Sequence, residues 1–201
     1  HIGGTTGLLE KIKVGKIYVN TDVPSSETSK ELFDYLKLHN IPYVVAKNDM
    51  KIHEEKDLIF NIYMNKSIDE NGKSIINLLK YKDFNAVFMG DAGVLGYKVL
   101  PKGLKINVLK LGHHGAKGTI NKKILEKFEP KTVIISTGKN PYKHPHKMIT
   151  DLLYKNHTHY LRTDKRHAVE IVTDGISAQE NCYSTKKHKF LECSLKLSFL
   201  K

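Results

Sequence analysis

The chain of 201 residues contains no apolar run that approaches the roughly 20 residues needed for a membrane-spanning helix, so we expect it to be soluble. It has only two cysteines, Cys182 and Cys193, which is too few for the dense disulfide framework of a small secreted scaffold and leaves the redox compartment undecided. With 14 glycines and 6 prolines it is neither collagen-like nor of low complexity, and its 40% hydrophobic residues can form a substantial core.

Arginine is also scarce, although the chain is strongly basic. Only Arg162 and Arg166 are arginine among 33 basic residues, and the formal net charge is +12. Such a charge favours polyanionic partners, either nucleic acid or an anionic membrane surface. The joint abundance of Lys, Ile and Asn is also what an A+T-rich coding sequence produces, so charge alone leaves both explanations open.

Several sequence signatures of function are missing. There is no Gly-x-Ser-x-Gly motif and no cysteine near a promising histidine, so covalent nucleophilic catalysis has no support. The opening His1-Ile2-Gly3-Gly4 lacks an initiator Met and the features of a signal peptide, and we expect the chain to begin within a domain. Its glycines fit neither nucleotide fingerprint, so we expect no nucleotide cofactor.

Apolar periodicity predicts alternating short strands and helices, and therefore the α/β fold class. The predicted strands cover residues 17–19, 43–46, 58–64, 74–79, 86–89, 107–111, 132–136, 160–163 and 168–173. The predicted helices follow Ser25 or Ser26 and cover 121–128 and 150–154. We expect one domain over 1–175, followed by a basic tail over 176–201 in which the alternation of 191–199 predicts an edge strand.

Three polar clusters each follow a predicted strand, at residues 90–91, 112–115 and 138–146. Because ligands gather at the carboxyl ends of strands in α/β architectures, we expect these clusters to converge. Asp91 follows a buried type of strand, where its carboxylate either binds a strong partner such as a metal or caps the next turn.

The histidines of these clusters are candidate metal ligands, since neutral imidazole binds zinc and manganese. His113 and His114 are adjacent, so only one would face a given site unless the flanking glycines turn the loop. His144, between prolines, is either a ligand in a rigid loop or a surface histidine in a turn. We interpret the remaining histidines without such a context as surface or packing residues: His39, His53, His157, His159, His167 and His188.

An ordered series of segments resembles the metallo-β-lactamase-fold domain of ComEC-type competence proteins and their stand-alone relatives. The resemblance covers residues 1 to about 175 and rests on His1-Ile2-Gly3-Gly4, Asn71 with Ser74, Gly90-Asp91-Ala92, Leu109 to Gly115, Ile135 to Gly138 with Asn140 and Tyr142, His144-Pro145, and Arg162-Thr163-Asp164. It implies an αββα sandwich with a divalent-metal site at one edge of its two sheets.

The first metal motif of that family is His-x-His-x-Asp-His-x-Gly-Gly, and His1 matches its last histidine, with the preceding part absent from this chain. The resemblance implies these metal ligands: His1, Asp91, His113, His114 and His144. It also implies catalytic roles for Asp91, His114 and Lys110, and substrate binding by Ser74, Asn140 and Lys117. Ala116 departs from the usual Ser, which removes at most one hydroxyl hydrogen bond.

The function implied by the resemblance is metal-dependent hydrolysis of DNA phosphodiesters, with two zinc or manganese ions in the complete domain. Lysines would bind single- or double-stranded DNA without reading its sequence. Because the upstream motif is absent, we expect this chain alone to be weakly active or inactive. The further partners implied are membrane channel domains of the same full-length chain, which would place this domain on the outer face of the plasma membrane, whereas a stand-alone relative would be cytoplasmic.

Two alternatives remain, because a fold alone does not fix a substrate. The first is a metallo-β-lactamase-fold hydrolase of a small ester, lactone or lactam, which an apolar pocket beside Asp91 would favour. The second is a non-catalytic DNA-binding piece of a transport protein. DNA binding that survives chelation, with no turnover, would favour it.

Overall fold

The computed structural model describes residues 2–65, 69, 71–193 and 197–198. The chain divides into two compact units, His1–Lys47 and Asn48–Lys201. His1, a predicted metal ligand, lies outside the described residues. The sequence-based division after residue 175 stays a prediction.

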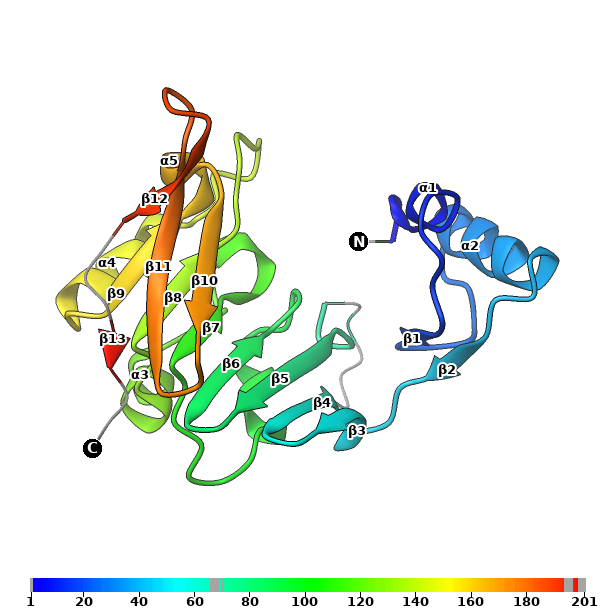
Figure 1. Cartoon of the computed structure of the whole chain (residues 1–201), viewed down its shortest axis with the longest axis horizontal. Coiled ribbons are helices and arrows are strands. Elements are labelled where there is room, and N and C mark those ends of the chain that lie inside the picture. Colours follow the sequence, from blue (N-terminus) through cyan, green and yellow to red (C-terminus); the bar gives the residue numbers. More distant parts are fainter. Residues whose placement is uncertain (1, 66–68, 70, 194–196, 199–201) are drawn as a thin grey trace. The chain divides into compact units, whose positions relative to one another are not determined.

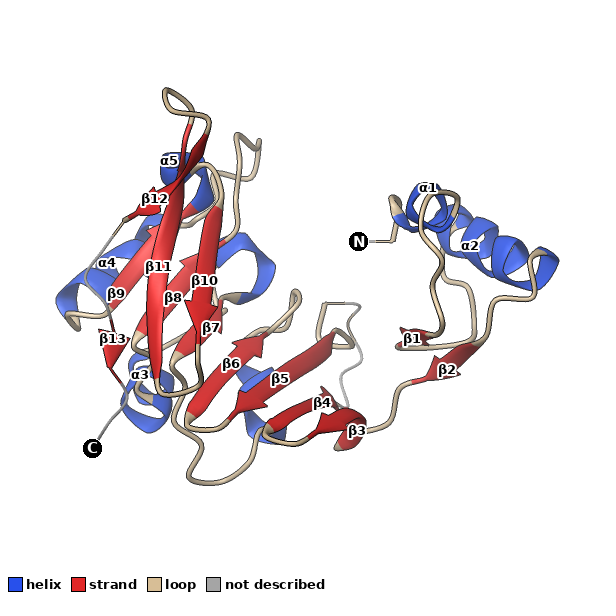
Figure 2. Cartoon of the chain, in the orientation of Figure 1, coloured by secondary structure: helices blue, strands red, loops and turns tan. Residues whose placement is uncertain are grey.

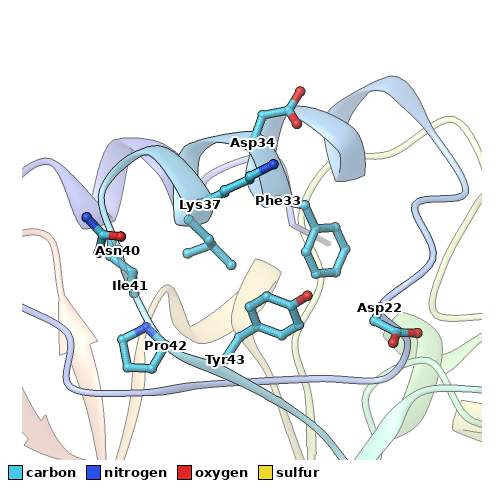
Figure 3. A pocket seen from close by; sticks show the side chains of 9 residues that line it. Asp22, Phe33, Asp34, Lys37, Asn40, Ile41, Pro42 and Tyr43 are labelled. Atoms are coloured by element: carbon cyan, nitrogen blue, oxygen red, sulfur yellow. The ribbon is translucent and has the colours of Figure 1, made fainter.

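The first unit contains α1 (Thr5–Leu9), β1 (Ile17–Val19), α2 (Glu27–Leu38) and β2 (Tyr43–Val45), and its two strands pair in parallel (Figure 1). Helix α2 begins as the sequence predicts, because two reciprocal hydrogen bonds cap it. The Ser26 hydroxyl accepts from the backbone N–H of Ser29, and the Ser29 hydroxyl accepts from the backbone N–H of Ser26. Leu32 and Leu36 of this helix are buried. A pocket of about 510 Å³ lies between α2 and the start of β2, with Phe33 and Tyr43 edge-to-face at its wall (Figure 3).

The second unit is built on a seven-stranded sheet whose strand order equals the chain order. The strands are β3 (Met50–Glu55), β4 (Leu58–Met64), β5 (Ile75–Tyr81), β6 (Phe84–Phe88), β7 (Val108–Lys110), β8 (Thr132–Ile135) and β9 (His159–Arg162). Neighbours from β3 to β6 are antiparallel, and neighbours from β6 to β9 are parallel. The parallel half is the part that organises the candidate site.

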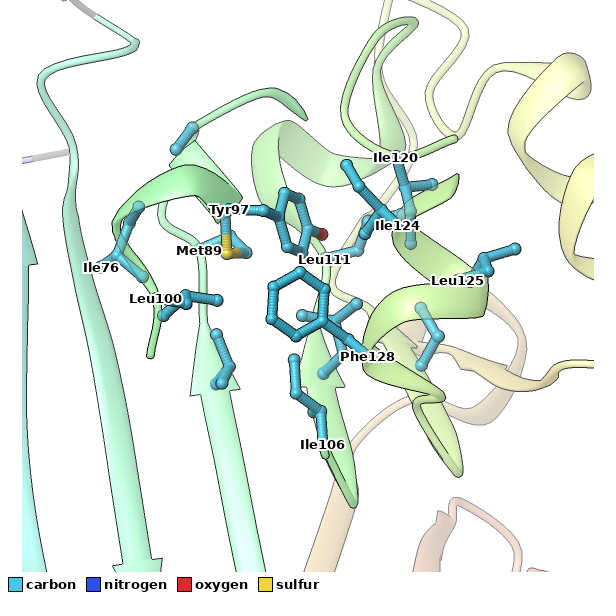
Figure 4. Close-up of a cluster of buried hydrophobic side chains, with 14 of the residues drawn as sticks. Ile76, Met89, Tyr97, Leu100, Ile106, Leu111, Ile120, Ile124, Leu125 and Phe128 are labelled. Atoms are coloured by element: carbon cyan, nitrogen blue, oxygen red, sulfur yellow. The ribbon is translucent and has the colours of Figure 1, made fainter. Parts of the chain in front are cut away.

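Helices cover one face of this sheet. They are η1 (Val94–Val99), α3 (Lys122–Phe128) and α4 (Lys147–Lys155), while η2 (Gly112–Gly115) and α5 (Thr163–Arg166) are single turns after β7 and β9. The main hydrophobic core lies under them, where Tyr97, Leu111 and Phe128 point toward one another (Figure 4). The Asn121 side chain caps α3 by accepting a hydrogen bond from the backbone of Ile124, at the helix start that the sequence predicts.

A second, antiparallel sheet packs on the other face (Figure 2). It comprises β10 (Val169–Thr173), β11 (Ser177–Ser184), β12 (Lys189–Glu192) and β13 (Leu197–Ser198). Phe84, Val108 and Ala178 meet in the apolar layer between the sheets. Alternate residues of β7 thus face opposite sides, because Val108 enters this layer whereas Leu109 enters the main core.

The residues after 175 differ from the polar tail that the sequence indicates. Residues 177–184 form β11 in the middle of the second sheet, with Ala178, Glu180 and Cys182 buried at every second position. Cys182 forms a disulfide with Cys193, at a Cα to Cα distance of 5.2 Å. Of the edge strand predicted over 191–199, residues 194–196 and 199 lie outside the described residues.

The α/β class is confirmed, with a large mixed sheet and helices as its main components. The sequence predicts neither β3 nor β11. It predicts β4 with its observed bounds, and the other predicted strands of the large sheet differ from the observed ones by one or two residues at one or both ends. Within the described residues, each helix is too short or too polar to span a bilayer.

Candidate active site

The three polar clusters meet at one edge of the sheet. Strands β6, β7 and β8 are parallel neighbours, so the loops that follow them leave the sheet on the same side. The backbone ties these loops together, because His113 N donates to Gly90 O at 3.0 Å and His146 N donates to Gly115 O at 2.9 Å. The expected convergence is therefore present in the backbone itself.

Two glycines allow the loops to approach this closely. A Cβ at Gly112 would lie 2.2 Å from the backbone oxygen of Ala92, and a Cβ at Gly115 would lie 2.7 Å from Cβ of Pro145. Gly115 also has a φ of +78°, which L side chains rarely adopt. No larger residue fits either position without moving the loop that follows β6 or β8.

His113 and His114 turn the loop themselves. Both have left-handed backbone conformations, with φ of 44° and 54°, which is uncommon outside glycine and costs on the order of 1–3 kcal/mol per residue. Their ring centroids are 6.3 Å apart with an interplanar angle of 69°. Because of this turn, the two rings contact different neighbours at the same edge: His114 contacts Ser136, and His113 contacts His144.

The His114 ring is oriented by the end of β8. Its Nδ1 lies 2.7 Å from the backbone oxygen of Ser136. A carbonyl oxygen only accepts, so Nδ1 carries a proton and donates, which leaves Nε2 with a lone pair in the neutral ring. This arrangement is the usual one for a metal-binding histidine.

His144 lies on the other side of His113, with 5.4 Å between the ring centroids. Partial burial lowers the pKa of His144 below its ordinary value, and the nearby His113, His114 and His146 lower it further, against an opposing effect of Asp91. His144 is therefore neutral at pH 7, as a metal ligand must be. It precedes Pro145, to which it is joined by a cis peptide bond.

The loop that carries His144 is held by Asn140. The Asn140 amide nitrogen donates to the backbone oxygens of Gly138 and His144, both at 2.8 Å, and its Oδ1 accepts from His144 N at 3.0 Å. These bonds close the loop over Thr137, whose hydroxyl also lies within hydrogen-bond distance of His144 O. Asn140 thus positions His144, and its predicted contact with substrate stays a prediction.

Asp91 is positioned by Ser74, the residue before β5, and lies near Lys110. Its backbone N donates to the Ser74 hydroxyl at 3.0 Å, so Ser74 fixes the turn after β6. Burial lowers the pKa of Lys110 from its ordinary value, and the negative charge of Asp91 opposes this shift. The predicted residues Ser74, Asp91 and Lys110 therefore belong to one neighbourhood.

Asp91 and His113 line a cavity of about 270 Å³, together with the predicted substrate-binding residue Lys117. The sequence analysis assigned no site role to some of the other lining residues, namely Asn65, Asp69 and Leu95. Asp69 Oδ1 accepts a hydrogen bond from Gly72 N at 2.7 Å, which forms the turn that brings Asn71 to the cavity. The only sequence signal for the lining residues Asp69 and Asn71 is the polar run 69–72 before β5, and that run predicts a turn, not a site.

The donor chemistry of this edge fits a divalent metal in part. One carboxylate and three histidines gather there, and the ring of His114 is oriented as in a ligand. Among the described residues, however, no group of three His, Cys, Asp or Glu side chains is arranged to hold an ion. His1, which the resemblance adds to the ligands, is outside that part of the chain.

Comparisons with known proteins point in one direction. No family model matches the chain. It is 28% identical over 178 residues to ComE operon protein 3 of Bacillus subtilis, which covers 85% of the chain and 23% of that protein. It is 32% identical over 88 residues to Recombination protein 2 of Haemophilus influenzae, covering 43% of the chain and 11% of that protein.

A third relative is Competence protein ComA of Neisseria gonorrhoeae, at 30% identity over 121 residues, 57% of the chain and 18% of that protein. The chain thus spans less than a quarter of the length of each of these relatives. Its similarity is to competence and recombination proteins.

Proposed function

We propose that this chain is the metallo-β-lactamase-like hydrolase domain of a DNA-uptake protein, and that it hydrolyses DNA phosphodiesters with the help of divalent metal. The observation that carries the proposal is the meeting of Asp91, His113 and His144 at the carboxyl edge of three parallel strands. Unrelated packing requirements give no reason to gather histidines and a carboxylate beside a cavity. The similarity to competence proteins supports the choice of DNA as the substrate.

The residues that would hold the metal are Asp91, His113, His114 and His144, with His1 as a further ligand. A bound divalent ion would lower the pKa of water and neutralise charge on a phosphodiester. Asn140 and Ser136 orient two of these histidines, since Asn140 bonds to the backbone of His144 and Ser136 accepts from His114. Zinc and manganese both suit this mixture of imidazole and carboxylate.

Lysines would bind the phosphates on either side of the reacting bond. Lys117 lies at the cavity beside His113, and Lys110 lies near Asp91 in a half-buried position. A lysine ammonium is a compact point charge that binds phosphate without reading the base sequence. The cavity lining includes Asp69, Asn71 and Lys117, polar groups that can contact a phosphodiester, beside the apolar Val94 and Leu95.

The test is cleavage of fluorescent single- and double-stranded oligonucleotides in the presence of Mn²⁺ or Zn²⁺. Both the present chain and a version extended upstream of His1 through a His-x-His-x-Asp motif would be assayed. We expect the extended protein to cut, and Asp91→Asn to lower its rate at least 100-fold, because electrostatic groups at a reacting centre contribute on the order of 10²-fold or more.

A matched control is Asp151→Asn, which removes the same charge from an exposed ion pair with Lys147 on α4 and should leave the rate within twofold. Chelation with EDTA should abolish cutting by the extended protein and by its Asp151→Asn variant. An extended protein that loads metal, leaves DNA intact and hydrolyses a small ester instead would overturn the DNA substrate. DNA binding without any turnover would select the non-catalytic alternative.

A further inference from the structure

The loop that carries His144 presents a large aromatic side chain to solvent. Tyr142 is 75% exposed and lies two residues before His144. Its ring is stacked on His144, with the centroids 5.8 Å apart and an interplanar angle of 27°. In Figure 1 this loop is the yellow-green segment between β8 and α4.

The loop is built to hold Tyr142 in this place. The hydrogen bonds of the Asn140 side chain tie residue 138 to residue 144, so the tyrosine projects from a closed turn. One face of the ring is directed to His144 and the exposed remainder is available for a ligand. Lys139 and Lys143 on either side are exposed, and Lys117 lies at the neighbouring cavity.

An exposed aromatic ring among lysines is the combination by which proteins bind unpaired nucleic acid. Bases stack on the ring while lysines contact the phosphates, and the interaction tolerates any base because every base has a π-face. In a duplex those faces are covered by neighbouring base pairs, so a rigid ring of this kind discriminates against paired DNA.

We infer that Tyr142 is a substrate-binding residue that stacks an unpaired nucleobase next to His144, so that the site takes single-stranded or frayed DNA. This inference rests on the proposed function for the identity of the ligand as DNA. The stack would fix the position of the strand, while Lys117 and its neighbours would contact the adjoining phosphates. Tyr142 is therefore a specificity-determining residue for strand state.

The test is equilibrium binding by fluorescence anisotropy in EDTA, where no cleavage can occur. The probes are a 12-nucleotide single strand, an abasic sugar-phosphate strand of the same length, and a blunt duplex. We expect the parent protein to bind the base-containing strand most tightly. Tyr142→Ala should weaken that binding about 10-fold, which corresponds to about 1.4 kcal/mol, and should leave binding of the abasic strand unchanged.

Two variants separate stacking from other effects. Tyr142→Phe keeps the ring and should bind like the parent. Tyr154→Ala removes a tyrosine that is 77% exposed on α4, away from the loop, and should also bind like the parent.

A Tyr142→Ala protein that keeps the parental preference for base-containing single strands overturns the inference. So does equal weakening of the abasic strand, because it would show a purely electrostatic or structural effect. If the parent binds no DNA at all, both this inference and the DNA substrate of the proposed function fail. If DNA is cleaved normally and Tyr142→Ala binds all three probes as the parent does, only this inference fails and the proposed function stands.

Discussion

Glu180 is a carboxylate with no exposed surface, and it depends on partners from two other strands. The Thr132 hydroxyl of β8 and the His159 ring of β9 both bond to it across the two packed sheets. The hydrogen bond from His159 raises the pKa of that histidine above its ordinary value, although partial burial of the ring opposes the shift. A buried charge is thereby compensated by a titrating partner.

This pair gives the stability of the second unit a pH dependence. Because the pKa of His159 is raised in the folded state, its contribution to the free energy of unfolding is fully present below its unfolded pKa of about 6.5. That contribution is lost as pH rises through the higher folded pKa. We expect the free energy of unfolding, measured in urea, to fall as the pH rises above about 6.5. His159→Gln, which keeps a hydrogen-bond donor without a titratable charge, should flatten that slope. Identical slopes for the two proteins would show that the pair does not act this way.

The loop after β7 is the element on which the site geometry depends most. A Cβ at Gly112 would meet the backbone oxygen of Ala92 at 2.2 Å, and neither backbone segment can yield cheaply. We expect Gly112→Ala to destabilise the protein by about 1–3 kcal/mol, as overpacking generally does, and to lower Tm by about 2–4 °C per kcal/mol.

Gly138→Ala is the matched control in the loop after β8, because its Cβ would have no heavy atom within 4 Å. Thermal melts of the two variants should differ clearly, with Gly138→Ala close to the parent. Equal melting temperatures would mean that the loop after β7 is free to move away from Ala92.

Elements with strong local signals could be predicted from the sequence, and elements held by distant partners could not. Ser26 and Asn121 cap helices through bonds to the following turn, so their positions are readable locally. Strand β11 is polar, and its buried Glu180 becomes acceptable only beside Thr132 and His159, 48 and 21 residues earlier. Strand β3 lies at the sheet edge and is mostly exposed, and its apolar alternation is limited to Met50 and Ile52, which is too short to predict a strand.

The same distinction applies to the candidate site. That the loops after three strands meet follows from the parallel sheet and was predictable. The left-handed turn at His113 was not, because His113 is held by a backbone hydrogen bond to Gly90, which only the folded chain brings close. The Asn140 side chain bonds within its own loop, to residues two and four positions away, but its residue type alone does not distinguish this from a contact with a ligand. The roles of the site residues stay predictions.

At the scale of the whole molecule, the net charge of +12 makes any DNA affinity strongly dependent on salt. We expect the logarithm of the binding constant for single-stranded DNA to fall linearly with the logarithm of NaCl concentration. Lys117→Gln should reduce the steepness of that line by about 0.7, the value for one lost phosphate contact on a single strand.

Lys51→Gln is the control for this measurement, because Lys51 lies on the edge strand β3 and is already paired with Glu54. Its line should have the parental steepness. If the two lysine variants behave alike, Lys117 does not contact a phosphate.

The large sheet of the second unit places every strand beside its neighbour in the chain. Such an arrangement has a low contact order for a mixed sheet, so each strand can dock on the one synthesised just before it, without waiting for distant segments. The candidate site would then assemble in stages, with Asp91 first, His113 and His114 next, and His144 last. Under the proposed function, a nascent chain following this route would present Lys110 and Lys117 to DNA before the loop that carries His144 joins the site.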